Sequence, residues 1–135
     1  MFSRAIDSLF VLLLALGLVL LMARPSPAIP ARHGDMAQAF ATCAGRMGAM
    51  ATRARAFGQV DAREFDQLRD IFDDLLTALS TDENATNGWR NAGWTEIAQL
   101  LSEIDFGIDG PRAARSGDTL ARRIRTCRGM VLPQS

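Results

Sequence analysis

The sequence contains no tyrosine and no lysine, and it has only one histidine and two cysteines. The absence of lysine excludes Schiff-base and other lysine-dependent chemistry. The single histidine, His33, lies close to a predicted processing site, whereas a Ser-His-Asp triad needs a histidine held in place by the fold. No C-x-x-C-H segment is present, which excludes covalent attachment of a c-type haem. These absences predict a protein that is not an enzyme and that carries no cofactor.

The first 28 residues have the pattern of a secretory leader. Residues 9–23, LFVLLLALGLVLLMA, are uncharged, and Arg24-Pro25 follows them. Ser26 and Ala28 supply the small residues of a signal-peptidase site, so cleavage is expected after Ala28. Fifteen helical residues rise about 22 Å, which is less than the ~30 Å hydrocarbon core of a bilayer. We therefore expect a periplasmic or secreted protein; the alternative is an inner-membrane anchor formed by residues 9–23.

Removal of the leader leaves a chain with the length of one small domain. We expect residues 29–34 to form a flexible mature N-terminus and residues 35–132 to form the domain. Beyond residue 28 the chain has thirteen arginines and fourteen acidic residues. No general positive field therefore favours nucleic acid as a partner.

Four segments carry apolar residues at alternating spacings of three and four, the pattern of amphipathic helices. They cover about 36–57, 61–79, 84–106 and 110–131, and no segment alternates with the period of two that strands require. Short connections between such helices favour neighbours that run antiparallel. The sequence thus predicts an all-α fold, an antiparallel up-down four-helix bundle following a cleaved signal peptide.

Local signals mark where these helices begin and where they pack closely. Asp35 is placed to cap the first helix, and Asp61 with Glu64 forms a predicted capping box at the start of the second. Val60 and Phe65 have the spacing of a hydrophobic staple around the same start. The first helix also has a second stripe of small residues, which lets a neighbouring backbone approach: Ala37, Ala41, Ala44, Gly48 and Ala51.

The two cysteines, Cys43 and Cys127, lie on the apolar stripes of the first and last predicted helices. In an antiparallel bundle these helices run side by side, and the two cysteines then differ in height by roughly 6 Å. Thiols of exported proteins pair in oxidising compartments, so a disulfide is expected. Closing so long a loop stabilises a fold by about 4–5 kcal/mol in the chain-entropy model. Thiol oxidoreductases keep their cysteines two residues apart, so the wide spacing favours a structural bond.

Several short segments resemble a group of small exported helical proteins from marine and phototrophic alphaproteobacteria. The segments are Cys43 to Met47 (CAGRM), Trp89-Arg90, Ala98-Gln99 with Leu101, and the late Cys127. The resemblance implies an exported helical domain with two distant cysteines, and it implies no activity or catalytic residue. Gly93 and Trp94 stand where that resemblance leads us to expect ordinary helix-forming residues.

The last predicted helix carries a dense set of cations. Six arginines and only one acid, Asp118, fall within it, so it is a candidate docking face for an acidic protein or an anionic envelope component. If the leader stays uncleaved, phospholipid headgroups become a candidate as well. The alternative is pairing within the fold with the acidic 61–79 helix. We take Arg115, Arg122, Arg123 and Trp94 as the candidate partner-binding residues, since an exposed Trp marks many contact surfaces.

A second hypothesis makes this chain a carrier of a small ligand or of copper in the bundle interior. Met47 and Met50 lie on one side of the first helix, and His33 precedes them. Thioether and imidazole ligands suit copper. Methionine also fills gaps in apolar cores, however, and the same residues already account for the core stripe. The leading prediction is therefore an exported, non-catalytic helical domain that acts as a protein- or envelope-interaction module.

Overall fold

A computed structural model describes residues 33–79 and 81–132, and within these ranges it contains four helices and no strand. The predicted all-α, four-helix class is confirmed. No helix in the described ranges combines the length and the apolarity needed to cross a membrane. The leader, its cleavage after Ala28 and the alternative anchor at 9–23 lie outside the described residues. The helices are α2 (His33–Ala56), α3 (Ala62–Ala78), α4 (Glu83–Phe106) and α5 (Gly110–Val131).

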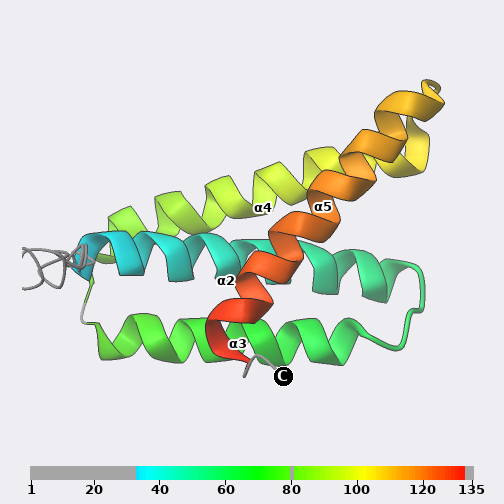
Figure 1. Cartoon of the computed structure of the whole chain (residues 1–135). Helices are drawn as coiled ribbons and strands as arrows, with labels where there is room; N and C mark the ends of the chain where they lie inside the picture. Colours follow the sequence, from blue (N-terminus) through cyan, green and yellow to red (C-terminus); the bar gives the residue numbers. More distant parts are fainter. Residues whose placement is uncertain (1–32, 80, 133–135) are drawn as a thin grey trace, which may run out of the picture. The chain divides into compact units, whose positions relative to one another are not determined.

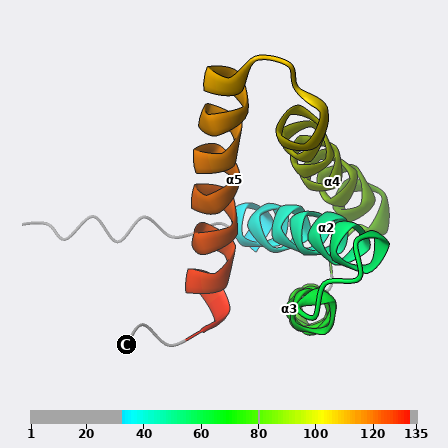
Figure 2. The same cartoon turned by 90° about the vertical axis from the view of Figure 1, so that its right-hand side faces the viewer.

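Helix α2 lies at the centre of the domain and contacts each of the other three helices. Helix α3 returns antiparallel to α2, and α4 covers another side of α2, as Figures 1 and 2 show. The apolar stripe predicted for the first helix fills the core between them along its middle, at Cys43, Met47 and Ala54, whereas Met36 and Phe57 at its two ends are exposed. The largest fully buried side chains are Phe72, Met47, Ile97, Cys43 and Cys127.

Two glycines let α2 and α4 approach until their backbones nearly touch. A Cβ atom added to Gly45 would lie 2.0 Å from the carbonyl oxygen of Arg90, and one added to Gly93 would lie 2.2 Å from that of Thr42. Only glycine fits at either position without moving a helix. Gly93 therefore does not interrupt α4, which is continuous; it is the point where α4 crosses α2.

Helix α5 does not lie alongside α2 as the predicted up-down arrangement required. It crosses α2 steeply, with α2 seen nearly end-on beside it in Figure 2. The buried residues of α5 are only Ser116, Ile124 and Cys127. So short an apolar contact fixes one crossing point and does not align the two helices along their length.

The predicted start of the second helix is only partly right. Asp61 occupies the N-cap position, but its side chain makes no capping hydrogen bond. Val60 is fully exposed, so the predicted staple with Phe65 does not form. Glu64 binds Arg128 of α5 at 2.7 Å instead of closing a capping box. A tertiary ion pair has replaced the local contact that the spacing predicted.

The other helix starts differ from prediction by a few residues. Helix α2 begins two residues before Asp35, which lies in its first turn. The side chain of Asp82 caps α4 by accepting from the backbone N–H of Asn84, and that of Asp109 caps α5 by accepting from Arg112. Short polar side chains satisfy the free N–H groups at both starts.

Candidate functional site

Three of the six arginines of α5 are used to hold the helix in place. Arg112 binds Glu103 at 2.6 Å, Arg123 binds Glu96 at 2.8 Å, and Arg128 binds Glu64. Two of these acids lie on α4 and only one on α3, so the acidic second helix is not the main partner of α5. The predicted site residue Arg123 thus has a structural partner.

The other three arginines, Arg115, Arg122 and Arg125, are exposed and form no ion pair with an acid in 33–79 or 81–132. Arg122 donates only to the hydroxyl of Thr119, at 3.3 Å. The three residues lie within about 80° of one another round the helix and span about 15 Å along it. We call them the α5 arginine face; Asp118 lies on the same side and offsets one of the three charges.

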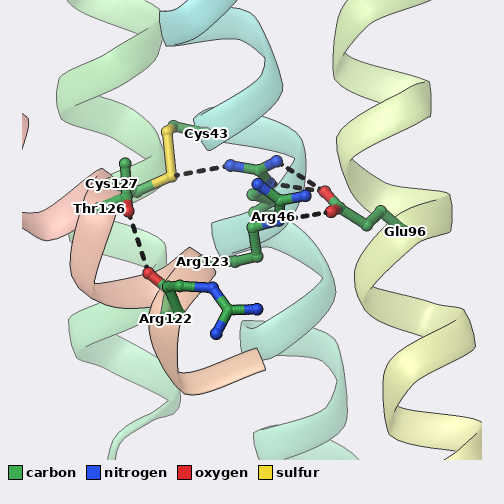
Figure 3. Close-up of a disulfide and its surroundings, with 7 residues drawn as sticks. All are labelled: Cys43, Arg46, Glu96, Arg122, Arg123, Thr126 and Cys127. Carbon is green, nitrogen blue, oxygen red and sulfur yellow. Dashed lines mark hydrogen bonds and ion pairs between the residues drawn. A yellow bond between two sulfur atoms is a disulfide. The ribbon is translucent and has the colours of Figure 1, made fainter. Parts of the chain in front are cut away.

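The predicted disulfide is present: the Sγ atoms of Cys43 and Cys127 are 2.03 Å apart and the Cα atoms 5.5 Å apart. Beside it, Arg46 donates to one oxygen of Glu96 at 2.9 and 2.7 Å and to the sulfur of Cys127 at 3.8 Å. Arg123 contacts the other oxygen of Glu96, so this carboxylate joins α2, α4 and α5 (Figure 3). The contacts fix α5 on α2.

This arrangement does not make the disulfide a redox centre. A guanidinium beside a cysteine sulfur favours the thiolate, which is the form that reacts in thiol exchange. Cys43 and Cys127, however, are only 1% and 0% exposed, so neither sulfur is accessible to a partner thiol. The geometry agrees with a structural bond between the first and last helices of the described domain.

Trp94 lies on a different surface from the α5 arginine face. It is two positions from Glu96, about 200° round α4, and Glu96 faces α5. Trp94 instead packs beside Gly48 of α2 and near Arg69 of α3. Its side chain is 40% exposed and lines a cavity between these helices. The structure therefore separates the predicted partner-binding residues into two surfaces.

A larger hollow of about 500 Å³ lies where α4 turns into α5. Glu103 accepts hydrogen bonds there from Ser116 and from Arg112, and these bonds, with Ser116 the larger cause, lower the pKa of Glu103. Phe106 and Ile108 line the same hollow and are exposed to solvent. Glu103 and Arg112 are paired with each other, and Asp109, which also lines the hollow, caps α5, so the fold already uses all three charged groups of this lining.

The residues of the copper hypothesis are not brought together. His33 begins α2 and lies fourteen residues from Met47, about 21 Å along the helix. Met47 is fully buried in the core. Within the described part of the chain, no three His, Cys, Asp or Glu side chains are placed to hold a metal ion.

The sequence interpretation missed the roles of Arg46 and Glu96. Arg46 follows Cys43 by three positions, the spacing that puts two residues on one side of a helix. This spacing could have indicated a cation near the disulfide, whereas Glu96 gives no comparable local signal. Comparison with known protein families, with characterised proteins and with solved structures gave no match.

Proposed function

We propose that this chain is an exported, non-catalytic domain that binds an acidic protein through the α5 arginine face. One observation carries the proposal: Arg115, Arg122 and Arg125 have no acidic partner in the described ranges, whereas the other three arginines of α5 do. Arginine is enriched in protein interfaces because its planar group donates several hydrogen bonds to carboxylates. The arginine face is therefore suited to a carboxylate-rich surface.

The disulfide supports export. Such bonds persist mainly in oxidising compartments, and here the bond joins helices that share little other apolar contact. The apolar leader in the sequence points the same way. The resemblance to small exported helical proteins also agrees with this location.

An acidic protein is favoured over a lipid surface as the partner. Helices that lie on membranes expose large apolar residues beside their cations. Helix α5 directs Ile124 and Cys127 into the domain. Its exposed large apolar residues, Met130 and Leu132, lie beyond the last residue of the arginine face, and the apolar residues exposed beside that face are Ala114 and Ala121. Such small side chains offer little apolar area to a bilayer.

The test is a charge reversal, Arg115→Glu/Arg122→Glu/Arg125→Glu, in the tagged protein with its leader. Proteins captured from an envelope fraction by the unaltered chain are identified first, and capture is then compared at low and high salt. The triple variant should keep its helical content and melting temperature and lose the captured acidic partner. Arg63→Glu, which reverses the charge of an exposed arginine on α3, is the control and should retain the captured partner. Unchanged capture by the triple variant would contradict the proposal.

A further inference from the structure

The cavity beside Trp94 is formed by α2, α3 and α4 together. Its floor is the small-residue stripe of α2 from Ala44 to Gly48, and its volume is about 210 Å³. Trp94 forms one wall, 3.5 Å from the position of a Cβ atom on Gly48. Because the floor lacks large side chains, the indole ring and the hollow beside it remain open to solvent.

Arginines supply all the charge on the lining of this cavity. Arg55, Arg69 and Arg90 line it, one from each of the three helices, and no acidic residue of the described chain does. Each is held from the α3 side by an aspartate at 2.5 to 2.9 Å. The aspartates, which orient the guanidinium groups and lie outside the lining, are Asp66, Asp70 and Asp73.

The fold does not use the full hydrogen-bonding capacity of these arginines. Arg90 donates to Asn87 and Asp73, but its Nε atom is buried and has no partner among the described residues. Arg55 donates to Asp66 and, weakly, to Thr52 at 3.4 Å, and half of its side chain is exposed. The buried Nε of Arg90 is not accessible, whereas the free donors of half-exposed Arg55, close to an exposed indole ring, suit a ligand with an anionic end and a planar apolar body.

The volume of the cavity limits the size of a ligand that can bind there. Pockets for drug-sized molecules measure about 300–1,000 Å³. A cavity of about 210 Å³ is smaller and fits a single ring with a short side group.

We propose that the Trp94 cavity is a binding site for a small aromatic monocarboxylate. The ring lies against Trp94 and the small-residue floor, and the carboxylate accepts from the surrounding arginines. This site is separate from the α5 arginine face, since Trp94 and the Glu96 that faces α5 lie on opposite sides of α4.

The probe is phenylacetate, with the neutral amide phenylacetamide and the ringless acetate as comparisons. Trp89→Phe leaves Trp94 as the only tryptophan in a chain that has no tyrosine, so emission reports on this site alone. Phenylacetate should bind saturably with a Kd of about 1 mM, as expected for so small a ligand. Both comparison compounds should bind at least about tenfold more weakly, because each lacks one of the two recognised groups. The indole N–H resonance of Trp94 provides a second measurement.

Arg55→Gln removes one charge from the lining and should weaken phenylacetate binding about tenfold. Arg122→Gln makes the same change on α5 and should leave binding unaltered, which also separates this site from the α5 arginine face. Equal affinity for phenylacetate and its amide, or no change in emission or resonance at 50-fold the expected Kd, would overturn the proposal. Tighter binding of a tripeptide that ends in phenylalanine would overturn the assignment to a free acid.

Discussion

The three helices α2, α3 and α4 and the last helix, α5, are held in the domain by different means. Helices α2 and α4 meet backbone to backbone at Gly45 and Gly93, and α3 buries Phe65, Leu68, Phe72 and Leu76 against the same core. Helix α5 buries two apolar side chains and is attached by one covalent bond and ion pairs on α3 and α4. Steric fit holds α2, α3 and α4 together, whereas individual bonds hold α5.

This difference shows how one small domain can combine a closely packed core with a helix that stays largely exposed to solvent. Close helix packing leaves α2 with little exposed area along its central turns. A helix held by a few bonds can keep most of its surface in solvent, and α5 does so. The α5 arginine face is a consequence of that mode of attachment.

The largest expected effect is removal of the disulfide. Replacing both cysteines, Cys43→Ala/Cys127→Ala, should lower the free energy of unfolding by about 4 kcal/mol. Hydrogen exchange should show the greatest loss of protection in α5, because the other three helices keep their packing. The control is Thr126→Ala, at an exposed position next to Cys127. It should change neither the free energy of unfolding nor the hydrogen-exchange protection of α5. A uniform loss of protection across all four helices would show that α5 is not the less firmly held part.

The second test adds a single methyl group at each of two places in α4. Gly93→Ala puts a carbon 2.2 Å from the oxygen of Thr42, so α2 and α4 must separate, at a cost of about 3 kcal/mol. Gly88→Ala lies in the same helix with no atom within 4 Å of the added carbon, and it should stabilise by about 0.5–1 kcal/mol. Urea unfolding measures the change in the free energy of unfolding for both variants. Equal changes would mean that the close approach of α2 and α4 does not contribute to stability.

The smallest expected effect concerns an ion pair within the packed helices and its dependence on pH. Arg53 of α2 donates to Asp105 of α4 at 3.0 and 2.6 Å, and this hydrogen bonding lowers the pKa of Asp105 below its ordinary 3.8. A lowered carboxyl pKa stabilises the fold above the unfolded value, and that stability is lost as pH falls through the folded value. Arg53→Gln should therefore destabilise by less than about 1 kcal/mol at pH 7.

The difference between Arg53→Gln and the unaltered protein should shrink as the pH falls below 3.8. Urea unfolding at several pH values measures this trend. Arg63→Gln, on exposed α3 with no ion pair in the described ranges, should show no such trend. A difference for Arg53→Gln that is constant with pH would mean that the pair does not contribute as a charged pair.

The features that the sequence predicted correctly are those set by periodicity along one helix. The stripe through Cys43 and Met47 became core, and Gly48 of the small-residue stripe lies against Trp94 of α4, although the closest backbone approach is at Gly45, just beside that stripe. The disulfide followed because both cysteines lie on apolar stripes. These properties depend on which side of a helix a residue occupies, and spacing alone decides that.

The features that it did not predict depend on how the helices cross. The packing of α4 on α2 brings Glu96 to Arg46, and the steep crossing of α5 adds Arg123 to the same carboxylate, on the side of α4 away from Trp94. The same crossing brings Arg128 to Glu64, which removes the capping box predicted at Asp61. Crossing geometry comes from the sum of side-chain contacts between elements far apart in sequence, and no local pattern records it.

The disulfide also changes what a protease can achieve. The three connections between helices all lie within the 84-residue loop that Cys43 and Cys127 close. A cut in any one of them therefore leaves two pieces that are still joined, and no helix can diffuse away. A single nick should appear only after reduction, as two bands on a gel, while the unreduced domain still migrates as one covalent molecule. The bond therefore protects the domain against fragmentation, because a cut in one connection does not release a piece of the chain.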